Sequence, residues 1–96
     1  MDELIHEFTT DVIDEDGHVY SARAMGRRRR GATVWEGWLE FTPRGGGGIV
    51  RQSPTETTQP NREALVYWAS GLERVYLEGA LERAITSRSE GRAAPN

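Results

Sequence analysis

The stretch Thr33-Val34-Trp35-Glu36-Gly37-Trp38-Leu39-Glu40-Phe41 decides the fold, because large apolar side chains recur along it with a period of two. Successive side chains of a β-strand point to opposite faces of the sheet, so Trp35, Leu39 and Phe41 are predicted to face the core. Trp38 is then expected on the opposite face. Gly37, between the two tryptophans, predicts either space for a bulky neighbour or a bulge.

Strand patterns also occur on both sides of this stretch. Residues 4–13 and 18–27 flank the pair Asp16-Gly17, which is typical of a β-hairpin. On the other side, the glycine run 45–48 predicts a hairpin connection, and a short strand is expected over residues 49–53. Together, the four segments predict an antiparallel meander.

Helical patterns replace strand patterns after residue 53. Pro60 and Asn61 are typical of a helix start, and Gly71 predicts a left-handed helix end. Between them, four apolar side chains follow the spacing of one helix face: Leu65, Trp68, Ala69 and Leu72. A second helix is predicted over residues 72–85, with five side chains facing inward: Leu77, Ala80, Leu81, Ala84 and Ile85.

The predicted fold class is therefore α+β, an antiparallel four-stranded β-meander followed by two C-terminal α-helices packed on one face. The apolar faces of sheet and helices are expected to share one core: Trp35, Leu39, Phe41, Leu65, Trp68, Leu77 and Leu81. The length of 96 residues allows a single domain, predicted over residues 1–86. Residues 87–96 carry no apolar period and are predicted to form a disordered tail.

Composition excludes several classes of protein. The chain has no cysteine, which excludes disulfides and thiolate metal sites. The acidic N-terminal segment carries no apolar run of signal length, and no segment approaches the roughly 20 apolar residues of a membrane span. We therefore expect a cytoplasmic protein with no membrane partner. Charge is unevenly distributed, because residues 1–20 hold seven acidic residues, whereas residues 21–51 hold seven arginines.

The segment Arg27-Arg28-Arg29-Arg30 is the most strongly charged feature and is predicted at the tip between two strands. Four guanidinium groups near an exposed Trp38 would bind phosphates and stack bases, so binding of nucleic acid or a nucleotide is the alternative function. Two further interpretations remain, a solvated loop and a site for an acidic protein partner. The acidic first strand is expected to neutralise part of this charge.

A second candidate anion site lies at the start of the first helix, where Thr58, Asn61 and Arg62 would meet the unpaired N–H groups. The same edge is the only candidate rim of an enzyme site, and it offers no general base. His6 and His18 would lie up to roughly 40 Å apart along the first hairpin, too far to share a metal ion. The acidic residues 11–16 do not match a calcium loop, so neither a metal nor a cofactor is predicted.

Three segments together resemble a group of small uncharacterised bacterial proteins of similar length: Trp35–Phe41, Glu56–Arg62 and Val75–Leu81. The resemblance covers residues 18–86 and implies a bacterial cytosolic setting without any activity.

The leading functional hypothesis is a non-enzymatic protein-binding or self-association module. Its interface is predicted on the uncovered face of the sheet, where Trp38, Val34 and Met25 would be exposed. A homodimer would form through that face or through an edge strand. A small enzyme is the least favoured hypothesis.

Overall fold

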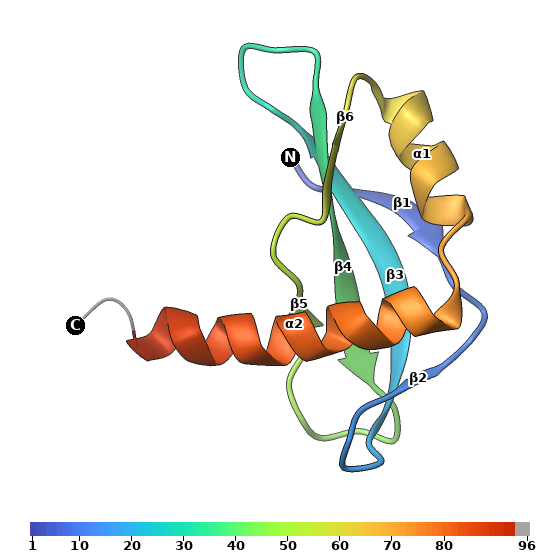
Figure 1. Ribbon diagram of the computed structural model, residues 1–96, viewed down its shortest axis with the longest axis vertical. Coiled ribbons are helices and arrows are strands. Elements are labelled where there is room, and N and C mark those ends of the chain that lie inside the picture. The colour runs from blue at the N-terminus through green and yellow to red at the C-terminus, as the bar shows by residue number, and fades with distance from the viewer. Residues whose placement is uncertain (94–96) are drawn as a thin grey trace.

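The computed structural model describes residues 1–93, and side chains are described through Thr86. Six strands precede two helices: β1 (Glu3–Glu7), β2 (Val12–Ile13), β3 (Val19–Arg28), β4 (Trp35–Pro43), β5 (Arg51–Gln52), β6 (Thr57–Gln59), α1 (Arg62–Ser70) and α2 (Arg74–Ala93). The strands form one antiparallel sheet in the order β1-β3-β4-β5, in which β2 also pairs with β3 and β6 with β4 (Figure 1). The α+β class is confirmed.

The sheet contains more and shorter strands than the predicted four. The first predicted strand, residues 4–13, is interrupted by a bend at Thr9 and Thr10, so it becomes β1 and β2. The fourth predicted strand shrinks to β5. Strand β6 was not predicted, because its polar sequence lacks apolar alternation; its pairing with residues 35–37 of β4 depends on how the preceding connection returns to the sheet.

The long β3–β4 hairpin forms the centre of the sheet. Its register is continuous through the cross-strand pair Gly26 and Gly37, so Gly37 marks no bulge in this hairpin. A Cβ atom added at Gly26 would lie 2.5 Å from Cδ2 of Leu65, and one added at Gly37 would lie 2.6 Å from Cδ1 of the same side chain. The two glycines therefore form a depression in the sheet that receives Leu65 of α1.

Both helices pack on the same face of the sheet, and α2 crosses the strands steeply (Figure 1). Five residues of the predicted core are fully buried between sheet and helices: Leu39, Phe41, Leu65, Leu77 and Leu81. Trp35 and Trp68 are partly buried and pack against this cluster. Among residues 1–93, neither helix is long and apolar enough to cross a membrane.

The helix ends differ in part from the prediction. Asn61 caps α1, because its Oδ1 accepts a hydrogen bond from the Ala64 amide at 2.8 Å. Gly71 ends α1 with a φ of −95°, so the predicted left-handed conformation is wrong. Helix α2 continues beyond its predicted end at residue 85 to Ala93, and no proline interrupts the chain between Pro60 and Pro95. The predicted tail thus begins within a helix, and residues 94–96 lie outside the described residues.

Candidate functional site

The outer face of the sheet, opposite the helices, does not present the predicted aromatic anchor. Trp38 lies on this face as expected, because it pairs with Met25 of β3 while Leu39 pairs with Ala24. However, Trp38 is only 5 % exposed, and Met25 and Val34 are partly buried. The Arg27 guanidinium lies 4.9 Å from the centroid of the indole and covers it. The predicted exposure of Trp38 is therefore wrong.

Ion pairs cover much of the remaining outer face. Nε of Arg23 on β3 donates to Glu40 of β4 at 2.6 Å, and the Gln52 amide donates to the other oxygen of Glu40 at 2.8 Å. Nearer the hairpin tip, Arg29 pairs with Glu36 at 2.9 Å. Bonded polar groups therefore flank Trp38, and the apolar side chains beside it on this face are the partly buried Met25 and, one strand further, Leu4, which is 42 % exposed.

The four arginines of the tip do not form one cationic cluster. Arg27 pairs with Asp2 at 3.4 Å, and Arg29 with Glu36, so carboxylates neutralise two of the four. Arg28 donates from Nη1 to the Ala32 carbonyl oxygen at 3.4 Å, a long hydrogen bond. Within residues 1–86, neither Arg28 nor Arg30 forms an ion pair.

The predicted anion site before α1 is largely occupied by the chain's own groups. Thr58 belongs to β6 and is exposed, and the Asn61 side chain serves as the helix cap. Nε of Arg62 donates to Glu3 at 2.9 Å, so its charge is already paired. The Arg62 guanidinium also lies 6.0 Å from the centroid of the Trp35 ring. These contacts fix the start of α1 against β1 and β4.

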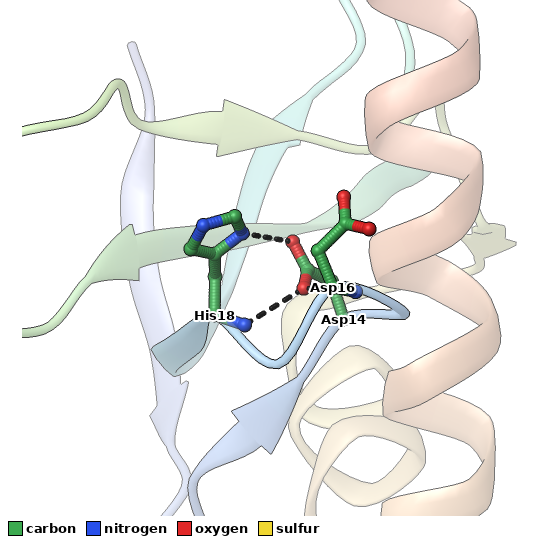
Figure 2. A group of neighbouring side chains, drawn as sticks. All are labelled: Asp14, Asp16 and His18. Atoms are coloured by element: carbon green, nitrogen blue, oxygen red, sulfur yellow. Dashed lines mark hydrogen bonds and ion pairs between the residues drawn. The ribbon is translucent and has the colours of Figure 1, made fainter.

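The β2–β3 turn brings together Asp14, Asp16 and His18, whose potential ligand atoms lie within 4.8 Å of one another (Figure 2). Oδ1 of Asp14 accepts hydrogen bonds from the amides of Asp16 and His18 at 2.9 and 2.8 Å, and its Oδ2 lies 3.2 Å from Nδ1 of His18. Burial would raise the pKa of Asp14, but these hydrogen bonds outweigh it and lower the pKa. The Asp14 carboxylate thus closes a hairpin turn in which Gly17 has a φ of +86°. Three ligand atoms on this turn do not complete a metal coordination sphere.

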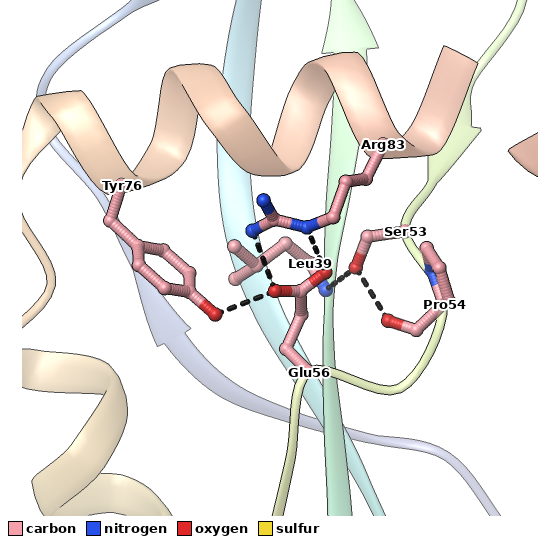
Figure 3. A network of polar contacts seen from close by, with 6 residues as sticks. All are labelled: Leu39, Ser53, Pro54, Glu56, Tyr76 and Arg83. Atoms are coloured by element: carbon pink, nitrogen blue, oxygen red, sulfur yellow. Dashed lines mark hydrogen bonds and ion pairs between the residues drawn. The ribbon is translucent and has the colours of Figure 1, made fainter. Parts of the chain in front are cut away.

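A second polar network joins the β5–β6 connection to α2 (Figure 3). Tyr76 donates to Oε1 of Glu56 at 2.5 Å, and Arg83 binds both oxygens of Glu56, at 2.8 and 3.1 Å. The Glu56 side chain is only 5 % exposed. Burial would raise the pKa of Glu56, but hydrogen bonds from Arg83 and Tyr76 outweigh it, so the pKa is lowered. Burial and the bond to Glu56 raise the pKa of Tyr76 to about 12.

This network is structural, because all its groups are bonded to one another. Nearby, the Leu39 amide donates to Oγ of Ser53 at 3.0 Å, and Ser53 donates to the Pro54 carbonyl oxygen at 2.9 Å. Sequence reasoning missed the network. The available signal was the spacing of Tyr76 and Arg83, two helical turns apart on one face of α2.

An acidic groove of about 750 Å³ lies between the β2–β3 turn and α2. Its acidic side chains are Asp14, Glu15, Asp16, Glu78 and Glu82, and its apolar side chains are Ile13, Val75, Leu81 and Ile85. Ile13 is 53 % exposed and Val75 is 81 % exposed, which is unusual for side chains of this type. No basic residue lines the groove among the residues the structure describes. We call this feature the acidic groove.

Most carboxylates without an arginine partner gather in the acidic groove. Outside the groove, Glu7, Glu63 and Glu73 form no ion pair within residues 1–86, whereas six carboxylates pair with arginine: Asp2, Glu3, Asp11, Glu36, Glu40 and Glu56. In the groove, by contrast, only Asp14 has a basic partner within residues 1–86, namely His18. The Glu82 carboxyl raises the pKa of Glu15, through a hydrogen bond and through its charge. The groove therefore concentrates negative charge that the described part of the chain does not neutralise.

The acidic groove combines two segments far apart in the sequence, which is why sequence reasoning did not find it. The local pattern of residues 14–17 predicts a hairpin turn and does not match a calcium loop. Glu78 and Glu82 stand one turn apart on α2 and are typical of any solvated helix face. Only the packing of α2 beside β2 brings the two sets together.

The chain matches no protein-family model, no curated protein and no solved structure. The resemblance to small bacterial proteins stays a prediction.

Proposed function

We propose that this chain is a non-enzymatic protein-binding module that holds a basic, partly apolar segment of a protein partner in the acidic groove. The observation that carries the proposal is the combination of unpaired carboxylates with exposed Ile13 and Val75. Carboxylates around a groove attract arginine and lysine. Apolar side chains within the groove stabilise a complex when a partner covers them and removes them from water. A segment with both kinds of side chain matches the groove in charge and polarity.

The openness of the groove favours a macromolecular segment over a small-molecule substrate. Enzyme and cofactor sites enclose most of the ligand surface, and catalytic carboxyl groups are usually shifted by desolvation. Glu15 and Glu82 are exposed, so neither carboxyl has such surroundings. The two carboxylates repel each other, and a cationic group of a partner would reduce this repulsion.

The expected binding depends strongly on salt. Charges at an exposed rim mainly accelerate association and set specificity, and salt screens them over about 8 Å at physiological ionic strength. The apolar side chains of Ile13 and Val75 are expected to slow dissociation. We therefore expect weak binding that is lost at high salt.

A labelled amphipathic peptide tests the proposal by fluorescence anisotropy at low salt. The probe carries leucine and arginine on a helical spacing, and a matched peptide carries glutamate in place of arginine. The arginine peptide should bind, and Glu78→Gln with Glu82→Gln should weaken binding by about tenfold. Glu7→Gln with Glu63→Gln is the control, because both residues are exposed and lie outside the groove. Equal binding by the two double variants would overturn the proposal.

A further inference from the structure

We infer that a second copy of this chain supplies the basic segment, through the tip of its β3–β4 hairpin. The inference rests on the proposed function of the acidic groove and names its partner. The tip comprises residues 28–32, which contain Arg28 and Arg30. The contact joins two different surfaces of the chain, the tip of one copy and the groove of another.

The tip carries positive charge that the fold leaves available. Arg28 and Arg30 are exposed, and neither forms an ion pair with a side chain of residues 1–86. Their neighbours Arg27 and Arg29 are held on the outer face by Asp2 and Glu36. A guanidinium group binds a carboxylate with two parallel hydrogen bonds, so Arg28 and Arg30, which have no carboxylate partner within residues 1–86, can engage two carboxylates.

The tip is also preformed. The Arg29 amide donates to the Val34 carbonyl oxygen at 2.8 Å, and the Ala32 amide donates to the Arg29 carbonyl oxygen at 3.1 Å. Gly31 has a φ of +75°, a conformation that allows a tight turn. Since the backbone is already closed by these bonds, docking orders few additional groups and loses little entropy.

The tip and the acidic groove lie at different ends of the molecule. In Figure 1 the β3–β4 loop projects at the top, whereas the β2–β3 turn that borders the groove lies at the bottom. A chain whose longest extent is 38 Å therefore cannot place its own tip in its own groove. The surplus charges of opposite sign can meet only between copies.

Charge reversal on each side tests the inference. The tip variant is Arg28→Glu with Arg30→Glu, and the groove variant is Glu78→Arg with Glu82→Arg. All four residues are exposed, so both variants should keep the fold, which circular dichroism checks. Light scattering after gel filtration at low salt should show wild type above the monomer mass, and each variant alone as a monomer. An equimolar mixture should associate again, because the reversed tip fits the reversed groove.

A further variant, Glu7→Arg with Glu63→Arg, changes net charge as the groove variant does but lies outside the groove. It should associate like wild type. Association of the tip variant alone, or failure of the mixture to associate, would overturn the inference. A wild-type chain that stays monomeric at every concentration would also overturn it, while peptide binding to the groove would still support the proposed function. Absence of peptide binding would instead refute the proposed function itself.

Discussion

Substituting Gly37 by alanine tests how α1 is seated on the sheet. The new Cβ would lie 2.6 Å from Cδ1 of Leu65 and 3.3 Å from Cγ2 of Thr57, whereas carbon atoms in good contact lie about 3.5–4.0 Å apart. Leu65 is fully buried, so it must shift into close-packed neighbours. Such overpacking costs about 1–3 kcal/mol, while replacing a strand glycine gains about 0.5–1 kcal/mol. Overpacking exceeds this gain, and we expect a net loss of about 1–2 kcal/mol.

The same geometry predicts coupling between the two residues. Leu65→Ala alone should destabilise the fold by about 3–5 kcal/mol, because it leaves a cavity over Gly26 and Gly37. In the double variant, the alanine at position 37 occupies part of that cavity and no longer collides with Leu65. The two losses should therefore sum to about 1–2 kcal/mol more than the loss measured for the double variant.

Denaturant unfolding, followed by tryptophan fluorescence, measures these losses, and each kcal/mol should lower Tm by about 4–8 °C in a domain of this size. Gly79→Ala on α2 is the matched control. Its Cβ would lie 3.3 Å from Nη1 of Arg83, whereas Nε and Nη2 of this side chain donate the bonds to Glu56, so a small shift of Nη1 suffices and the variant should be neutral or slightly stabilised. A Gly37→Ala variant as stable as wild type, or strictly additive losses, would refute the seating of Leu65 described above.

Two further predictions concern the polar network and the outer face. Glu56→Gln should lower the free energy of unfolding at pH 7 by about 1–3 kcal/mol. Because the lowered pKa of Glu56 stabilises the fold only while the carboxylate is ionised, the variant should also lose less stability than wild type below about pH 4.3. Equal acid sensitivity of the two proteins in urea titrations would contradict this. Trp38→Ser should destabilise the fold by about 3 kcal/mol, because the ring is buried beneath Arg27. An unchanged thermal midpoint would show that Trp38 is exposed after all.

Local periodicity was sufficient to predict which face of the sheet or helix each central side chain occupies. The alternation around Gly37 predicted that Trp35 and Trp38 lie on opposite faces, and the helical spacing correctly placed Leu65 inside. Periodicity does not measure how well a face is covered. Trp38 is buried because Arg27, from the neighbouring strand, lies over its ring, and this contact depends on the register between β3 and β4.

Local periodicity also does not report contacts between segments that lie far apart in the sequence, so features that depend on such contacts were not predicted. Strand β6 is too short and polar to show a pattern of its own, and it exists because it pairs with β4. Glu56 has no local signature in the sequence, yet it contacts Tyr76 and Arg83 on α2. Each of these features is a property of the assembled fold.

The acidic residues in the N-terminal quarter of the chain fall into two groups in the folded structure, those paired with arginine and those that line the acidic groove. Asp2, Glu3 and Asp11 lie beside Arg27, Arg62 and Arg44 in the folded chain, and each pairs with one of them. Glu15 and Asp16 occur in the same acidic run, but the tight turn carries them past the last pair of the β2–β3 ladder, where they line the acidic groove with Glu78 and Glu82 of α2 and form no ion pair with arginine within residues 1–86. Since a nearby like charge raises the free energy of an ionised carboxyl, α2 makes this turn a place where a cation is favoured. The position of one helix therefore separates the acids that pair with arginines of the fold from those that carry the proposed binding of a partner.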